Sequence, residues 1–132
     1  MKSKQILILA CILGALAVIL GAFGAHGLAE KLSPEKLEIF KLGVSYQYYH
    51  VFALLACGIL GKSLQSEKLF SIAAICFLIG IFCFSGSLYL LSTRPLSGLD
   101  FLTPVLGPMT PIGGLFLIVG WIIMAYSIFK SK

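Results

Sequence analysis

Two histidines and a short run of polar side chains are the residues of this sequence that could carry chemistry. His26 lies near the end of one long apolar stretch, and His50 lies inside another. On a helix Tyr46 and Gln47 share a face with His50, because positions three and four residues apart are neighbours. Ionisable side chains at membrane depth commonly mark functional sites. The sequence predicts a ligand-binding site on the outer half of the protein, formed by His26, Tyr46, Gln47, His50, Ser87 and Tyr89.

Three kinds of site are compatible with this polar set. Tyrosine and tryptophan often lie at membrane interfaces, so the set could be interfacial structure alone. It could instead line a path for a small molecule or ion. Two histidines could also ligate haem iron axially, or bind copper together with the thioether of Met109. Because the chain contains only two histidines, metal or haem binding is the weaker alternative, and we expect no cofactor.

The remaining reactive side chains do not indicate catalysis. All five acidic residues lie in the segments between apolar stretches, so acid–base chemistry inside a membrane would depend on histidine alone. The four cysteines lie within apolar runs and form no CxxC pair, which is typical of buried thiols. We therefore expect no catalytic residues and no enzyme activity.

The composition restricts the class of protein that holds these residues. The chain has 132 residues, of which 59% are hydrophobic and 11% charged, and its mean hydropathy is +1.03. Soluble domains are nearer half apolar and a quarter charged. The ten Lys and Arg residues are spread through termini and connecting segments, so no nucleic-acid surface is indicated. The sequence predicts one integral membrane domain, residues 1–132, whose partner is the lipid bilayer.

Charged residues divide the chain into four uncharged runs, each long enough to cross a bilayer as a helix of about 20 residues. The expected fold is all-α, an integral membrane four-helix bundle. The expected spans are residues 5–26, 44–62, 69–91 and 110–129.

Two connecting segments carry further signals. Ser33 and Pro34 are typical of a helix start, and apolar residues follow at helical spacing. They predict a short amphipathic interfacial helix before the second span. After the third span, prolines interrupt an apolar stretch, so Phe101–Met109 is expected to be a broken re-entrant or interfacial segment.

Charge and small residues predict topology and packing. With four spans, the side that holds both termini and the 62–68 loop carries six Lys and Arg residues against four on the other side. This bias predicts cytoplasmic termini in a multi-pass protein of the cell membrane. Small residues repeat along one face of the first span, which favours close helix packing within the bundle or against a second copy in a homo-oligomer. They are Ala10, Gly14, Ala17, Gly21 and Ala25.

Four blocks of the sequence resemble a family of small membrane proteins known as domain of unknown function 423. The blocks are Gly21–Leu28, Tyr46–His50, Phe84–Tyr89, and Thr110–Gly114 with Gly120 and Trp121. The resemblance covers essentially the whole chain and implies a four-span inner-membrane protein. It implies no activity. The leading interpretation is a non-enzymatic membrane protein with a polar ligand site, and the alternatives are a haem- or metal-binding redox protein and a small transporter or channel component.

Overall fold

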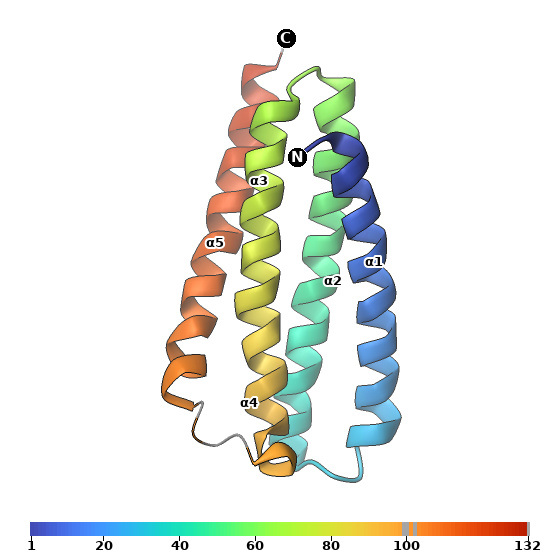
Figure 1. The fold of residues 1–132 in the computed structure, drawn as a ribbon, viewed down its shortest axis with the longest axis vertical. Coiled ribbons are helices and arrows are strands. Elements are labelled where there is room, and N and C mark those ends of the chain that lie inside the picture. Colours follow the sequence, from blue (N-terminus) through green and yellow to red (C-terminus); the bar gives the residue numbers. More distant parts are fainter. Residues whose placement is uncertain (99–100, 102, 132) are drawn as a thin grey trace.

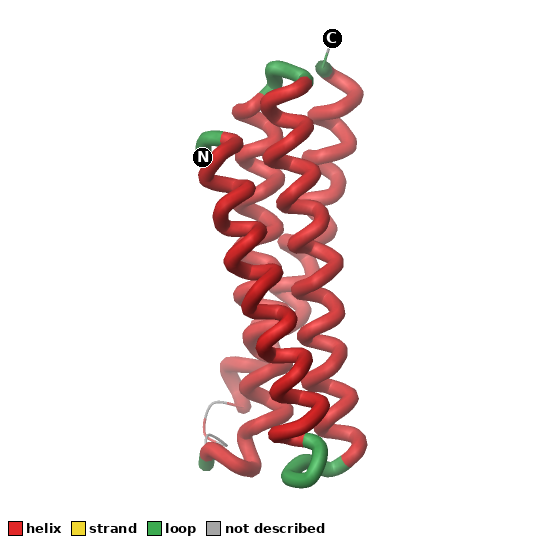
Figure 2. Tube along the Cα trace, turned by 90° about the vertical axis from the view of Figure 1, so that its right-hand side faces the viewer, coloured by secondary structure: helices red, strands yellow, loops and turns green. Residues whose placement is uncertain are grey.

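The computed structural model describes residues 1–98, 101 and 103–131, and these residues are helical apart from short turns. The helices stand side by side as four long columns, with both termini and the α2–α3 turn at one end (Figure 1). Loops are confined to the two ends of the columns (Figure 2). In chain order the elements are α1 (Ser3–Phe23), η1 (Gly24–Leu28), α2 (Pro34–Ser63), α3 (Glu67–Gly80), η2 (Ile81–Ser85), α4 (Gly86–Ser97) and α5 (Thr103–Lys130).

The columns match the expected four spans closely. Three of them are long and apolar enough to cross a membrane, namely Ser3–Leu28, Glu67–Ser97 and Thr103–Lys130. The fourth, α2, has 30 residues, a length of about 45 Å. It is less apolar because it carries the polar run Tyr46–His50.

The segment before the second span is not a separate interfacial helix. Ser33 caps the helix as expected, since its hydroxyl accepts a hydrogen bond from the backbone N–H of Lys36 at 3.4 Å. From Pro34 the helix then continues without a break through the polar run. Phe40 explains why the helix is continuous. Its side chain is buried, and the centroid of its ring lies 5.0 Å from that of Tyr89. This contact packs the first turns of α2 against α4, so that they run along the bundle with the rest of the helix.

The proline-rich segment also differs from the expectation. Within Phe101–Met109, residue 102 lies outside the described residues, and Thr103–Met109 form the first two turns of α5. Pro104 stands in the first turn, where an amide hydrogen is not needed. Pro108 removes the bond to the carbonyl of residue 104, but that carbonyl belongs to the exposed end of the helix. The prolines are therefore accommodated without breaking α5.

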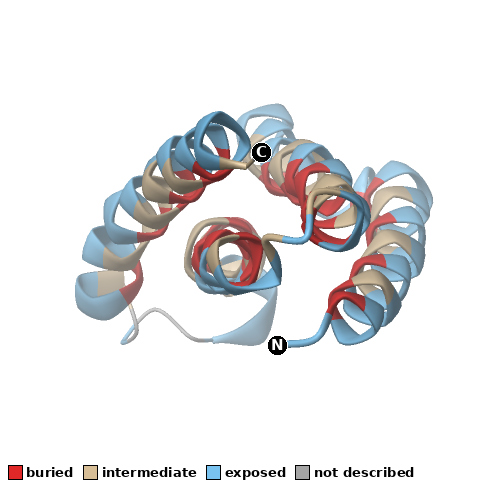
Figure 3. Cartoon of the chain, turned by 90° about the horizontal axis from the view of Figure 1, so that it is seen from above, coloured by how far each residue is buried: buried red, intermediate tan, exposed pale blue. Residues whose placement is uncertain are grey.

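The helices form an open arc rather than a closed ring. α1 packs along α2, α2 packs along α3, η2 and α4, and α3 with η2 packs along α5. Among the described residues, α1 and α5 share no extensive contact. Viewed along the columns, the column of α3 lies inside the arc (Figure 3). α2 and α5 likewise share no extensive contact among the described residues, and a groove opens between them.

Small residues set the helix register. Ala10 and Ala17 are fully buried, and a Cβ placed at Gly14 would lie 3.4 Å from Val51. The small-residue face of α1 thus packs on α2. The closest approach to the backbone of a neighbouring helix lies elsewhere, at Gly113 of α5, where an added Cβ would overlap the backbone of Cys83 and Phe84 in η2.

Candidate ligand-binding groove

The structure does not bring the two histidines together. Opposite Gly14 of α1 stands Val51 of α2, and opposite Gly24 stands Phe40. His50 therefore lies at the level of Gly14, and His26 lies twelve residues further along the first column, a distance of about 18 Å. His26 is exposed on η1. In this arrangement the pair cannot hold one small ligand, one haem iron or one copper ion, which corrects the predicted shared site.

His50 lies close to the middle of α2, slightly nearer to Lys41 than to Lys62. It is nine residues from Lys41 and twelve from Lys62, which corresponds to about 14 Å and 18 Å along the helix. The nearest charged residues of α2 thus lie on both sides of His50 at similar distances along the helix. His50 is near the middle of the apolar part of the bundle.

Gln47 and Tyr89 belong to a hydrogen-bonded network that joins three columns. The Gln47 side-chain amide donates to the carbonyl oxygen of Leu13 in α1 at 2.8 Å. The Tyr89 hydroxyl of α4 donates to Oε1 of Gln47 at 2.9 Å. Gln47 is only 2% exposed. Because both ends of its amide bond to the protein, this pair is structural in the observed arrangement.

Ser87 lies on a different face of α4 and bonds to α5. Its hydroxyl lies 2.7 Å from Oγ1 of Thr110 and donates to the carbonyl oxygen of Phe84 at 2.9 Å. Ser87 is fully buried. The predicted six-residue set is thus divided among separate contacts: Gln47 remains with Tyr89, and Tyr46 remains with His50.

The contacts of His50 define its tautomer. Nδ1 lies 2.7 Å from the carbonyl oxygen of Tyr46, and the indole N–H of Trp121 donates to Nε2 at 3.3 Å. A carbonyl only accepts and an indole N–H only donates. His50 is therefore a neutral imidazole with its proton on Nδ1 and a lone pair on Nε2.

A groove of about 510 Å³ opens beside this histidine, between α2 and α5. The Tyr46 ring stacks on Phe84 at a centroid distance of 4.4 Å. Trp121 is 48% exposed and contacts Phe77 edge-on, with centroids 5.3 Å apart. The lining residues are Tyr46, Tyr49, His50, Phe84, Gly114, Leu117, Ile118 and Trp121.

The π-helical segment η2 positions the inner wall of the groove. A π turn accommodates an extra residue and often occurs at functional sites. Here it places Phe84 against Tyr46, while Gly113 lets α5 approach the η2 backbone. The neighbouring Ser85 hydroxyl is buried and has no hydrogen-bond partner in the described part of the chain. The polar atom is thus left unsatisfied next to the wall.

Sequence reasoning missed the α5 side of this groove. Tryptophan is typical of membrane interfaces, but Trp121 lies nine residues from Lys130, about 14 Å into the helix. That depth is the signal that could have separated it from an aromatic belt. Gly114 gave no signal, because its role depends on which face of α5 meets η2.

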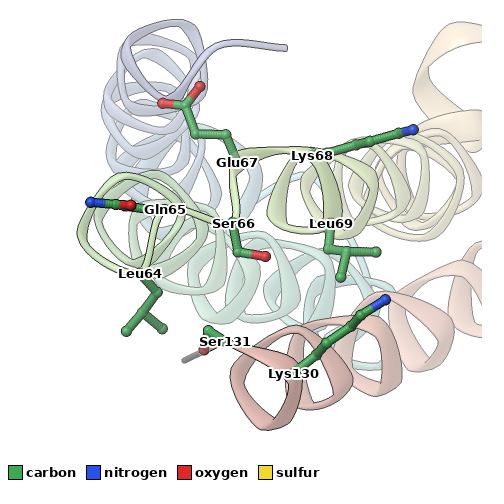
Figure 4. A pocket seen from close by; sticks show the side chains of 8 residues that line it. All are labelled: Leu64, Gln65, Ser66, Glu67, Lys68, Leu69, Lys130 and Ser131. Atoms are coloured by element: carbon green, nitrogen blue, oxygen red, sulfur yellow. The ribbon is translucent and has the colours of Figure 1, made fainter.

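A second hollow lies at the end of the bundle that holds the termini. It has a volume of about 490 Å³ and is lined by the α2–α3 turn and the end of α5. Figure 4 shows the side chains of Lys68, from the start of α3, and Lys130, from the end of α5, at this end of the bundle. Glu67 bonds instead to the Ser3 hydroxyl at 2.9 Å. This hollow is polar and lies far from His50 along the columns, so it is separate from the groove.

Comparison with known proteins gives matches along the whole chain. A family described as "Protein of unknown function (DUF423)" matches residues 20–114. A UPF0382 membrane protein of Haemophilus influenzae is 39% identical, covering 100% of this chain and 98% of its own. The UPF0382 membrane protein YwdK of Bacillus subtilis is 38% identical, covering 96% and 98%. No solved structure matches the chain.

Proposed function

The chain belongs to the DUF423 family of membrane proteins of unknown function, and we propose that it binds a bilayer-derived apolar molecule in the groove between α2 and α5. The role is binding rather than catalysis. The imidazole of His50 already has a hydrogen bond at each nitrogen. The other side chains that line the groove are aromatic or aliphatic, and their polar atoms are the tyrosine hydroxyls and the indole N–H.

One observation carries this proposal, namely the His50–Trp121 pair inside a lateral groove. Polar side chains at this depth are costly in lipid, so they usually face the bundle interior or a functional cavity. Here the pair faces an opening of about 510 Å³ lined mainly by apolar groups. Ligand sites commonly combine such an apolar lining with a few fixed polar groups.

The proposed setting is a cell-membrane protein with four crossings. α2 is long enough to cross with the other three columns, and its polar run packs against α1, α4 and α5. The Lys and Arg bias supports cytoplasmic termini. The partner in this setting is lipid, and the small-residue face of α1 is already used within the chain, so a homo-oligomer would need another face.

Trp121 is the only tryptophan, so its fluorescence reports on the groove alone. We would titrate the detergent-purified protein with 2-bromododecan-1-ol, because bromine quenches a tryptophan that it contacts. The expected result is a saturable component of quenching. Gly114→Leu should remove that component, because a Cβ at Gly114 would meet only Phe84, at 3.7 Å, and the longer side chain would fill the groove.

Gly86→Leu is the matched control. Gly86 has nothing within 4 Å of an added Cβ and lines a different hollow, between α1 and α4. This variant should keep the saturable quenching. Equal titration curves for wild type and Gly114→Leu, with both proteins monodisperse, would show that the probe does not occupy the groove and would refute the proposed function.

A further inference from the structure

We propose that the ligand of the α2–α5 groove is a neutral, long-chain molecule bearing a hydroxyl group, whose O–H donates a hydrogen bond to Nε2 of His50. This inference rests on the proposed function of the groove and names the chemical class of its ligand. It follows from the polarity of the hydrogen bonds that surround the histidine.

The first step is the fixed orientation of the imidazole. Nδ1 is 2.7 Å from the carbonyl oxygen of Tyr46 on the preceding helical turn. Because that oxygen can only accept, it holds the proton on Nδ1. Nε2 is consequently an acceptor, and a ligand that reaches it must bring a donor. A ketone, ether or ester without an O–H or N–H cannot make this bond.

The second step is the replaceable nature of the present donor. The indole nitrogen of Trp121 lies 3.3 Å from Nε2, so this hydrogen bond is a long one. The indole is half exposed on the open side of the groove, where a change of rotamer would meet lipid chains rather than packed protein. An entering hydroxyl can therefore take the place of the indole N–H at Nε2.

The third step concerns a second polar contact. The Tyr46 hydroxyl has no hydrogen-bond partner in the part of the chain that the structure describes, and Tyr46 lines the same groove as His50. A hydroxyl oxygen that donates to Nε2 keeps its lone pairs, and a phenol can donate to one of them. Tyr46 and His50 together thus suit a group that both donates and accepts.

The fourth step excludes a charged head group. None of the lining residues carries a formal charge while His50 is neutral. The nearest cations along α2 are Lys41 and Lys62, about 14 Å and 18 Å away. An unpaired carboxylate or phosphate at this depth would be strongly disfavoured. The rest of the lining, including Leu117 and Ile118, suits an alkyl chain.

The test compares 2-bromododecan-1-ol with its methyl ether, which has the same chain and bromine but no O–H. Saturable quenching of Trp121 should show the alcohol binding about fivefold or more tightly, the factor expected from one net hydrogen bond. In His50→Phe, whose ring keeps the groove wall apolar, the two probes should bind equally. Wild-type protein labelled with ¹⁵N-histidine gives a second readout that does not depend on this variant folding.

In that spectrum the alcohol should move the Nε2 resonance of His50 while Nδ1 stays protonated, and the ether should not. His26→Gln assigns the signal, because His26 is exposed and about 18 Å from the groove. Saturable binding of both probes with equal affinity and no Nε2 shift would overturn this inference while leaving the proposed function intact. Saturable binding of neither probe would overturn the proposed function itself.

Discussion

Gly113→Ala tests whether the close packing of α5 on η2 holds the groove wall in place. Gly113 is buried, and an added Cβ would lie 2.8 Å from the carbonyl carbon and 2.9 Å from the Cβ of Cys83. It would also overlap the backbone nitrogen of Phe84. These are largely backbone atoms, so no side-chain rotation relieves the overlap.

The size of the effect follows from these distances. Carbon atoms in favourable contact are about 3.5–4.0 Å apart, so α5 and η2 must separate by about 1 Å. Overpacked core positions typically cost about 1–3 kcal/mol. We expect the upper end for Gly113→Ala, because two helix backbones must move. About 3 kcal/mol corresponds to roughly a hundredfold change in the unfolding equilibrium.

Unfolding in mixed micelles with increasing sodium dodecyl sulfate, followed by Trp121 fluorescence, measures this change. Gly114→Ala is the matched control on the next residue, since its Cβ would meet Phe84 at an ordinary 3.7 Å. It should change the free energy of unfolding by less than about 0.5 kcal/mol. If Gly113→Ala and Gly114→Ala unfold at the same denaturant concentration, the inferred contact between α5 and η2 is wrong.

Three further predictions concern other parts of the fold. In a double-mutant cycle of Gln47→Leu and Tyr89→Phe, the buried hydrogen bond should give a coupling of about 0.6 kcal/mol and at most about 1.7 kcal/mol; strictly additive effects would contradict it. Gln65 has a left-handed backbone with φ of 50°, so Gln65→Gly should raise the unfolding free energy by about 0.5 kcal/mol, since relief of strain outweighs the flexibility of glycine; a lower stability would argue against this conformation. Reporter fusions after Lys132 and within the 62–68 loop should both be cytoplasmic, and an external signal from either would overturn the topology.

The sequence was sufficient to predict the four columns. Long uncharged runs must satisfy their backbone hydrogen bonds internally in lipid, so they fold as helices of nearly fixed length. The cap at Ser33 was also recognisable, and the structure confirms it. The continuous helix after the cap could not be predicted, because the packing of the first turns of α2 along the bundle depends on the tertiary contact between Phe40 and Tyr89.

The site was only partly predictable for the same reason. Helical spacing correctly placed Tyr46 and His50 together, since that relation is local. The predicted pairing of His26 with His50 required both residues to lie at the same height in the bundle. The height of α2 relative to α1 is known only from the packing of Gly14 on Val51. Likewise, the partner of His50 is Trp121, 71 residues away, and no local pattern links the two.

Depth-resolved quenching of Trp121 in bilayers tests the central claim most directly. The protein would be reconstituted into phosphatidylcholine with bromine at defined acyl positions, near the head group or near the chain end. Trp121 lies about 14 Å along α5 from Lys130, so quenching should be strongest for bromine near the bilayer middle, and saturating unlabelled 1-dodecanol should relieve part of it by occupying the groove. Strongest quenching from head-group bromine, or no relief by 1-dodecanol, would contradict a mid-bilayer groove that takes up a ligand from the side.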